Sequence, residues 1–390
     1  MSLPAIAFWC ATALLAWVYL GYPLLVGALA RLRPLRLRAD MPVPGLSIAI
    51  AVHDEADQVR DRVADALAQD GPGSPVVEVL VGSDGSSDST ERIVSDLAAT
   101  DARIRLLALP RAGQTPTQHA LFEAARGDVV VLTDAETRFA PGCLAGLATA
   151  LRDTRIGCAT GRLDWRDVDS TATSANEGLY WRYERAVRSL ESRAGLLTAV
   201  TGALLAVRRS AYRPVPPTAS MDHLLPLFIR EQGGQVVYVS SAVATDRPIR
   251  GVREQFRART RTATRGIRAN LSMAGRLAPW RRPGAALAVW SHKLLRWATP
   301  ILLAVAVVAA TVHALGGEAG YALVPIAAAL AAGVAAVAQL VAHTGRRPPR
   351  ALAIVRSFAV VNLAFALAWA NVLRGYRIEN WRRMEWEARR

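Results

Sequence analysis

The placement of apolar residues constrains this sequence more than any other feature. No charged residue occurs between Pro4 and Ala30. At about 1.5 Å per residue, a helix of this length crosses the roughly 30 Å hydrocarbon core of a bilayer. Further apolar runs lie toward the other end of the chain, at Trp297–Gly316, Tyr321–Ala342 and Ala351–Leu373. The sequence therefore predicts one N-terminal and about three C-terminal transmembrane helices, with a water-soluble domain between them.

The first apolar run is expected to be a retained anchor, because it is too long for the core of a signal peptide and no basic residues precede it. Arginines follow it at positions 31, 33, 36 and 38. By the positive-inside rule they place the middle domain on the cytoplasmic side of the cell membrane. Three later spans would put the C-terminus outside, whereas six arginines after Leu373 favour the inside. The side of the tail stays open.

The formal net charge is +15, although 52% of the residues are hydrophobic. So much apolar surface excludes a disordered chain. Nearly all the positive charge is arginine, which forms bidentate contacts with phosphate, and Lys293 is the only lysine. The arginines gather beside the apolar runs without interleaved aromatic residues, so nucleic acid is not an expected partner. Cys10, Cys143 and Cys158 form neither a disulfide framework nor a metal-ligand spacing, so we expect reduced packing residues.

Residues 46–245 alternate between strand-like and helix-like segments. Short apolar runs rich in strand formers stand at 46–52, 76–82, 104–109 and 128–132, with helical stretches at 55–69, from 89 onward and at 117–125. This alternation predicts a parallel sheet that is covered by helices on its faces. In such sheets, ligands bind outside the carboxyl ends of the strands.

Carboxylates follow three of the expected strands, in His53-Asp54-Glu55, in Ser83–Asp88 and in Asp134-Ala135-Glu136. Several carboxylates on one sheet edge are costly unless cations or hydrogen-bond donors gather there. Turn and helix-capping roles are the alternatives for Asp84, Asp88 and Asp134. The pair Asp134 and Glu136 could also offer hard oxygen ligands to Mg²⁺ or Mn²⁺. Neither a phosphate-binding P-loop nor a dinucleotide fingerprint occurs in the sequence.

As an ordered set, segments 47–55, 81–90 and 134–137 resemble the family-2 inverting glycosyltransferases, of the membrane-integrated polysaccharide-synthase-like type. Thr201–Arg209 resembles the acceptor-side strand of that family, and Met221-Asp222-His223 resembles the segment that bears the catalytic base. The stretch 256–266 stands where the family places a Gln/Arg-x-x-Arg-Trp element. The resemblance implies an α/β GT-A fold, with a Rossmann-like mixed sheet that binds a nucleotide-sugar.

The resemblance also implies a domain order. We expect a transmembrane helix at 1–30, a basic linker at 31–45, the GT-A catalytic domain at 46–245, Arg-rich interfacial or gating helices at 246–296, transmembrane helices at 297–373 and a basic tail at 374–390.

The family's site residues carry over by position. Asp222 would be the general base, and Asp134 and Glu136 would hold a divalent metal, Mg²⁺ or Mn²⁺. The acceptor would contact Trp181, Thr201, Gly202 and His223. The nucleotide-sugar, a UDP- or GDP-sugar, would contact His53, Asp54, Glu55, Asp84, Gly85, Ser86, Arg111, Asp134, Arg261 and Arg265.

Some positions depart from the family pattern. Asp54 stands where Asn is usual, Gln114 where Lys is usual, His119 where Asn is usual and Glu136 where Asp is commoner. Arg261 and Arg265 fit a variant Arg-x-x-x-Arg-Gly form of the later element.

Arginines recur every four residues at 253, 257, 261 and 265, which places them on one helix face. Such a face suits anionic lipid headgroups or a donor pyrophosphate. We expect Arg261 and Arg265 to face the donor, and Arg253, Arg268, Arg281 and Arg282 to face lipid. The aromatic–acidic segment 180–184 with Glu191 either packs on its neighbours or forms an acceptor-binding wall.

Three functions follow as hypotheses. The first is a membrane-bound glycosyltransferase that extends a polysaccharide or lipid-linked glycan. The second is a sugar transferase that acts on a polyprenyl phosphate or glycolipid beside the membrane. The third is a catalytically weak homologue that scaffolds a synthase complex, which the departures at Gln114 and His119 suggest. Because the chain has so few spans, we expect an oligomer or a synthase partner. Membrane lipid, the nucleotide-sugar and the acceptor are the other expected partners.

Overall fold

The computed structural model describes residues 2–165, 172–247, 252–344, 346 and 348–376, and omits the side chains of 172–181 and 252. Its middle part is built on one sheet with the strand order β3-β2-β1-β4-β7-β6-β8-β5. The strands are β1 Leu46–Val52, β2 Val76–Asp84, β3 Ile104–Leu109, β4 Val129–Thr133, β5 Arg138–Phe139, β6 Ile156–Trp165, β7 Leu205–Arg208 and β8 Gln235–Asp246.

The first half of the sheet confirms the pattern that the sequence predicts. β1 pairs in parallel with β2 and β4, and β2 pairs in parallel with β3. The connections contain α3 Ala56–Leu67, α4 Thr90–Ala98 and α5 Gln114–Ala124. Beyond β4 the sheet is mixed, because β7 runs antiparallel to both β4 and β6. The carboxyl ends of β1, β2 and β4 therefore meet at one edge.

Both faces of the sheet are covered, which explains why β1 is apolar throughout. Ile48 and Ile50 belong to a core formed with α3, α4 and α6 Cys143–Ala150. Ala49 and Ala51 point to the opposite face and join a core formed with α5 and α8 Met221–Glu231. A strand buried on both sides loses the alternation of apolar and polar residues that a half-exposed strand shows.

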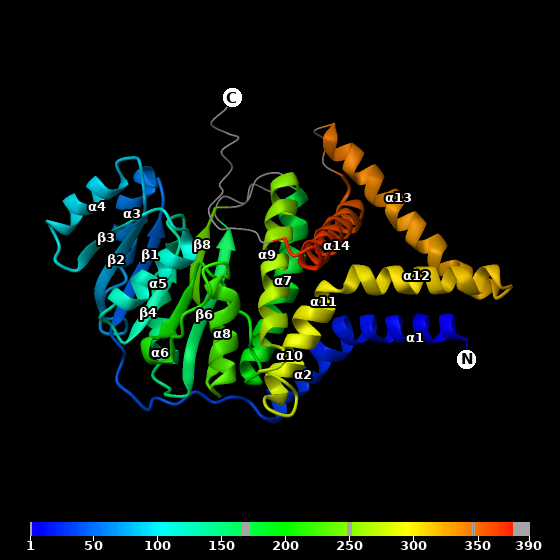
Figure 1. Cartoon of the computed structure of the whole chain (residues 1–390), viewed down its shortest axis with the longest axis horizontal. Helices are drawn as coiled ribbons and strands as arrows, with labels where there is room; N and C mark the ends of the chain where they lie inside the picture. The colour runs from blue at the N-terminus through cyan, green and yellow to red at the C-terminus, as the bar shows by residue number, and fades with distance from the viewer. Residues whose placement is uncertain (1, 166–171, 248–251, 345, 347, 377–390) are drawn as a thin grey trace.

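Long helices connect this domain to an apolar extension (Figure 1). α7 and α9 stand beside the sheet, and α1, α12 and α13 project away from it. The helical elements are α1 Leu3–Ala16, η1 Trp17–Gly21, α2 Tyr22–Leu32, α7 Ala172–Arg193, η2 Arg209–Ala211, α9 Val252–Met273, α10 Pro283–Ala288, η3 Val289–Leu294, α11 Leu295–Trp297, α12 Thr299–Leu315, η4 Ala319–Ala322, α13 Leu323–His343 and α14 Arg350–Leu373.

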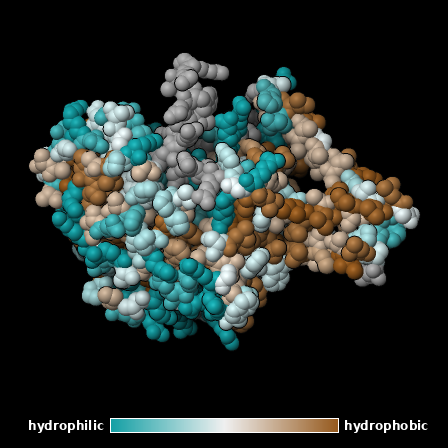
Figure 2. Space-filling model, in the orientation of Figure 1, coloured by the Kyte–Doolittle hydropathy of each residue, from teal (hydrophilic) through white to brown (hydrophobic). Residues whose placement is uncertain are grey.

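Three segments in the described part of the chain are long and apolar enough to cross a membrane, namely Leu3–Leu32, Ala319–His343 and Arg350–Leu373. The expected span at 297–316 differs, because α12 has only 17 residues and is bent by 61° from the helix Pro283–Trp297. This bent pair would make a fourth candidate if it forms one span. On the face shown in Figure 2, the projecting helices carry a large hydrophobic surface, while hydrophilic residues are more frequent over the sheet domain.

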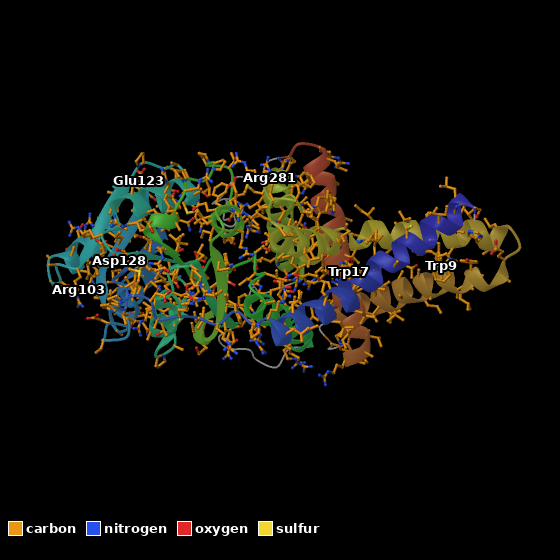
Figure 3. All side chains as sticks on the ribbon, turned by 90° about the horizontal axis from the view of Figure 1, so that it is seen from below. Trp9, Trp17, Arg103, Glu123, Asp128 and Arg281 are labelled. Atoms are coloured by element: carbon orange, nitrogen blue, oxygen red, sulfur yellow. The ribbon has the colours of Figure 1, made fainter. Side chains whose placement is uncertain are left out.

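α14 lies across the other apolar helices. In Figure 1 it is seen nearly end-on while α1 and α12 run along the page, and in Figure 3 it crosses the direction of α1, which carries Trp9. α14 packs mainly on α9, α7 and α13. Phe365 and Asn362 are buried, and Trp369 Nε1 donates to the Trp297 carbonyl over 3.1 Å. α14 is therefore attached to the helices that flank the sheet.

Gly161 marks a close approach within the sheet and supports a test of stability. The pairing of β6 with β8 shifts register after Gly161, and a Cβ there would lie 2.2 Å from the backbone oxygen of Ala242. Because a backbone atom must move, we expect Gly161→Ala to lower the free energy of unfolding by about 1–3 kcal/mol. Thermal unfolding in detergent would measure this effect. Gly71→Ala is the control, since a Cβ there meets nothing within 4 Å; equal losses in both variants would contradict the explanation.

Candidate active site

Asp84, the last residue of β2, binds the backbone of the loop that leads into α5. Its Oδ1 accepts hydrogen bonds from the amides of Ala112, over 2.7 Å, and Gly113, over 2.9 Å. The Arg111 guanidinium lies 3.3 Å from Oδ2. Gly85 has φ +61°, and a Cβ there would lie 2.9 Å from the Arg111 nitrogen. These contacts hold the backbone of the loop at Arg111 close to the end of β2.

The turn after β1 is tied to the turn after β2. Asp54 adopts φ +53°, a conformation that Asp and Asn tolerate better than most residues. Its Oδ1 accepts a hydrogen bond from the Ser87 amide over 2.7 Å, while its own amide donates to Ser86 Oγ over 3.2 Å. His53 Nδ1 lies 3.0 Å from the Asp84 carbonyl oxygen. These contacts join the two loops into one rim.

Asp134 follows β4 in the middle of the same edge. Burial and the negative charges of Asp246 and Asp222 raise the pKa of Asp134 to about 7. Arg62, which is fully buried beneath it, donates from Nε to the Asp134 carbonyl over 3.2 Å. Gln114 Nε2 lies 3.5 Å from Asp134 Oδ1.

Asp246 was not among the residues expected at this edge. It ends β8, a strand that pairs with β6 rather than with β1 or β4, yet its charge acts on Asp134. The same signal that identified Asp134, a carboxylate directly after a strand, was present in the sequence. Only the sheet order shows that both carboxylates serve one edge.

This surplus of carboxylates fits a divalent cation. Asp134 is influenced by three neighbouring carboxylates, and Glu136 follows two residues later. No group of three or more His, Cys, Asp or Glu side chains is placed to hold an ion within the described ranges. Asp134 and Glu136 stay the residues predicted to hold an ion, since oxygen-rich coordination is what Mg²⁺ and Mn²⁺ require.

Asp222 lies in the first turn of α8, next to its N-cap Ser220. Its Oδ1 accepts a hydrogen bond from Ser220 Oγ and lies 3.0 Å from His223 Nδ1. Burial would raise the pKa of Asp222, but His223, Ser220 and Arg265 together hold it well below its usual value. Oδ2 faces Gly202, where a Cβ would come within 3.2 Å. Asp222 is therefore held as an ionised carboxylate in a confined place.

A cavity of about 310 Å³ lies beside Asp222 and His223. Its walls come from the end of β6, from α7 and α9, from η3 and α11, and from α14. It thus connects the sheet domain with the apolar helices. Its aromatic lining is Trp165, Trp297 and Phe365, and its other charged lining residues are Glu184, Arg188, Arg259 and Lys293.

The arginines of α9 face in different directions. Arg265 is half-buried, and its pKa is lowered to about 10 by burial and by Arg261, against the opposing charge of Asp222. Arg261 and Arg253 are exposed. Arg268 donates to the Tyr376 carbonyl over 2.8 Å, beyond the end of α14.

Arg282 donates from Nε to the Glu231 carbonyl over 2.9 Å, whereas Arg281 is exposed (Figure 3). Arg268 and Arg282 thus each bind a backbone oxygen, and their expected contact with lipid stays a prediction. Both side chains donate hydrogen bonds to carbonyl oxygens that lie far from these arginines in the sequence.

The structure separates the expected residues into two groups. His53, Asp54, Glu55, Asp84, Gly85, Ser86 and Arg111 form the rim at the ends of β1 and β2. Gly202 and His223 lie beside Asp222, and Thr201 Oγ1 accepts a hydrogen bond from Arg188 over 3.0 Å. The side chain of Trp181 lies outside the described residues. The roles of these residues in binding remain predictions.

Because the protein offers few metal ligands, we expect a metal ion to stabilise it only together with a nucleotide. Mn²⁺ together with UDP or GDP should raise the melting temperature by a few degrees, whereas Mn²⁺ alone should have little effect, because the protein supplies too few ligands. Asp134→Asn should abolish the joint shift, and Asp96→Asn, on an exposed helix face, should preserve it. Full stabilisation of the Asp134 variant would contradict this assignment of the metal ligand.

Comparisons with known proteins agree with this geometry. Residues 47–215 match the sequence family described as Glycosyl transferase family 2. An N-acetylglucosaminyltransferase from Mesorhizobium japonicum is 28% identical over 219 residues, which cover 52% of this chain and 51% of that protein. One from Bradyrhizobium diazoefficiens is 25% identical over 294 residues, or 71% of this chain and 59% of that protein. The chain spans about half the length of most of the curated relatives it matches.

A solved structure is similar over nearly the whole chain. It is a mannosyltransferase from Pyrobaculum calidifontis in complex with GDP-Man and Mn²⁺, with a TM-score of 0.68 and 22% sequence identity. The match covers 94% of this chain and 99% of that one, and at this identity it shows the fold alone. Residues 47–215, which contain most of the sheet, are thus similar to glycosyl transferase family 2, and the similar structure agrees with the mixed sheet of this fold.

Proposed function

We propose that this chain is a membrane-bound inverting glycosyltransferase that transfers a sugar from a nucleotide-sugar to an acceptor held in the cavity beside Asp222. The observation that carries the proposal is the ionised Asp222 carboxylate at the wall of that cavity, near the carboxylate edge at Asp134. The acceptor class is a polysaccharide or a lipid-linked glycan. Inverting transfer needs a base on the acceptor side and charge neutralisation on the donor side, and the two groups of residues offer one each.

Asp222 would act as the general base. As the acceptor oxygen attacks the anomeric carbon, its proton would pass to the Asp222 carboxylate. The hydrogen bonds that the structure describes for this carboxylate go to Oδ1, from Ser220 and His223, so Oδ2 is the oxygen suited to take the proton. Gly202 allows the backbone to approach that oxygen closely.

On the donor side, Asp134 and Glu136 would hold the divalent ion, which would neutralise charge on the departing diphosphate. Arg265, and Arg261 from the exposed side of α9, would add bidentate contacts to the same group. The similar structure holds GDP-Man and Mn²⁺, and the curated relatives are N-acetylglucosaminyltransferases. Because these donors differ, they support a nucleotide-sugar as the class of donor without identifying the sugar.

The helix arrangement also suggests a membrane topology. We propose that the N-terminal helix Leu3–Leu32, α12 and α13 cross the cell membrane, while α14 lies along its surface. α14 runs across the direction of α1 and α12 and packs on α9 and α7 (Figure 1). Only two crossings then follow the catalytic domain, so the arginine-rich tail shares its side. With the catalytic domain in the cytoplasm, this arrangement obeys the positive-inside rule.

Cysteine labelling in oriented vesicles tests this topology. In a variant lacking native cysteines, a cysteine placed after Arg390 and one at the exposed Asp96 should react from the same side of the membrane. A cysteine at Gly317, between α12 and α13, should react from the opposite side. Labelling of the tail from the Gly317 side would show that α14 crosses the membrane.

Kinetics with a panel of UDP- and GDP-sugars test the catalytic proposal. Asp222→Asn should lower acceptor-dependent turnover by about 10²–10⁴-fold while nucleotide binding persists. Ser220→Ala removes a hydrogen bond to the Asp222 carboxylate, so the pKa of Asp222 should rise toward its usual value. The acidic limb of the kcat/KM profile, where the base becomes protonated, should therefore move to higher pH.

Asp96→Asn serves as the control for these kinetics, since its side chain is exposed on α4. Unchanged turnover in the Asp222 variant would remove it as the base. A parent protein that neither binds nucleotide nor releases it from any donor would instead favour the scaffold function.

A further inference from the structure

A buried cluster of charges forms one wall of the cavity beside Asp222. Glu184 of α7 is 3% exposed, and Oε1 lies 3.0 Å from Arg188 Nε and 3.2 Å from Lys293 Nζ. Arg296 contacts its other oxygen. Glu184 therefore faces three cationic side chains, and Glu184, Arg188 and Lys293 all line the cavity.

One more carboxylate, that of Glu191, belongs to this cluster, but the positive charges still outnumber the negative ones. Glu191, one of the fully buried residues of α7, accepts a hydrogen bond from Tyr22 and lies 2.8 Å from His292 Nδ1. The cluster thus contains three formal cations and two carboxylates, before any charge on His292. An unbalanced positive charge in a buried place is costly unless an anion compensates it. The wall that carries Lys293 therefore favours an anionic ligand.

Local backbone structure brings Lys293 to this place. It lies in η3, a short π-helical segment, and is the only lysine of the chain. π-helical turns are uncommon and often occur at functional sites. In η3 the neighbouring residues His292 and Lys293 both reach Glu184, over 3.2 Å each.

Two neutral polar groups in the cavity wall also require partners. Thr198 and Asn270 are each 4% exposed, and both line the cavity. Thr198 Oγ1 and Asn270 Oδ1 are buried with no hydrogen-bond partner among the described residues. A buried polar atom without a partner costs about 1–3 kcal/mol. Because the Asn270 oxygen can only accept, the ligand that satisfies it must bring a donor such as a hydroxyl group.

We infer that this cavity binds an acceptor in which a sugar is carried on a phosphate ester, with the phosphate at Lys293 and Arg188 and the sugar hydroxyls at Thr198 and Asn270. The inference rests on the proposed function, because one sugar hydroxyl would then face Asp222. Trp297 and Phe365, from the helices next to the membrane, supply the apolar side of the same cavity. This lining favours a phosphate ester attached to a lipid over a free sugar phosphate.

Binding measurements without donor or metal test the inference separately from catalysis. With the full-length protein in nanodiscs, isothermal titration would compare citronellyl phosphoglucose, glucose 1-phosphate and the uncharged citronellyl glucoside. We expect the first to bind at least about tenfold more tightly than the glucoside. If glucose 1-phosphate binds as tightly as the lipid-linked probe, the phosphate site stands and its source is a free sugar phosphate. Equal binding of the charged and uncharged lipids would overturn the inference.

Two kinds of variant assign the contacts. Lys293→Gln should weaken binding of both phosphorylated probes about tenfold and leave the glucoside unchanged, while Lys293→Arg should retain most of the affinity. Thr198→Val, which keeps the shape of the side chain, gives a second test that spares the charge cluster and should weaken the binding of all sugar probes. Arg281→Gln, on the exposed surface away from the cavity lining, is the control.

The outcomes separate this inference from the proposed function. Loss of selectivity for phosphate, with transfer to an unphosphorylated glycan intact, would overturn the inference alone. Selective binding of phosphorylated probes without transfer from any donor would support the binding site and overturn the proposed function.

Discussion

The contact on which the architecture depends is the buried Glu184 carboxylate. It joins α7 to the segment η3–α11, and through that segment to the apolar helix α12. Burial alone would raise the pKa of Glu184, but Lys293, His292 and Arg296 hold it well below its usual value. A buried carboxylate with this many cationic partners is stable only while all of them stay in place. The cluster therefore fixes the position of the helical part relative to the sheet domain.

The N-terminal helix depends on the same cluster. Tyr22 donates a hydrogen bond to Glu191, and Trp17 Nε1 donates to Ser291 Oγ over 2.9 Å. The first contact joins α2 to α7, and the second joins two π-helical segments, η1 and η3, that lie far apart in the sequence. Polar contacts between apolar helices orient them more specifically than apolar packing can, since their donors and acceptors must meet in one geometry. The N-terminal helix is thus attached to the charge cluster in the wall of the cavity beside Asp222.

Asp134 and Asp222 lie in opposite electrostatic environments. At the carboxylate edge, Asp134 stands among other acidic groups, so its charge is unfavourable until a cation arrives. At Asp222, hydrogen bonds and nearby cations stabilise the charged form in advance. A metal site must be electronegative to recruit its ion, whereas a base must be ionised before the acceptor binds. The fold supplies both environments because the end of β4 and the beginning of α8 lie on the same side of the domain.

The sequence alone determined much of this protein. The strands at 46–52 and 104–109, the mixed α/β class, the ordered family motifs and the apolar N-terminal helix were all predictable, because strand patterns and long apolar runs are local properties. Tertiary structure decided the rest. The partnership of Asp246 with Asp134 depends on strand order, and the charge cluster at Glu184 depends on residues about a hundred positions apart. The orientation of α14 is set by packing on α9, which composition does not encode. Local patterns report what a segment forms, whereas charge balance and helix direction depend on neighbours that only the folded chain brings together.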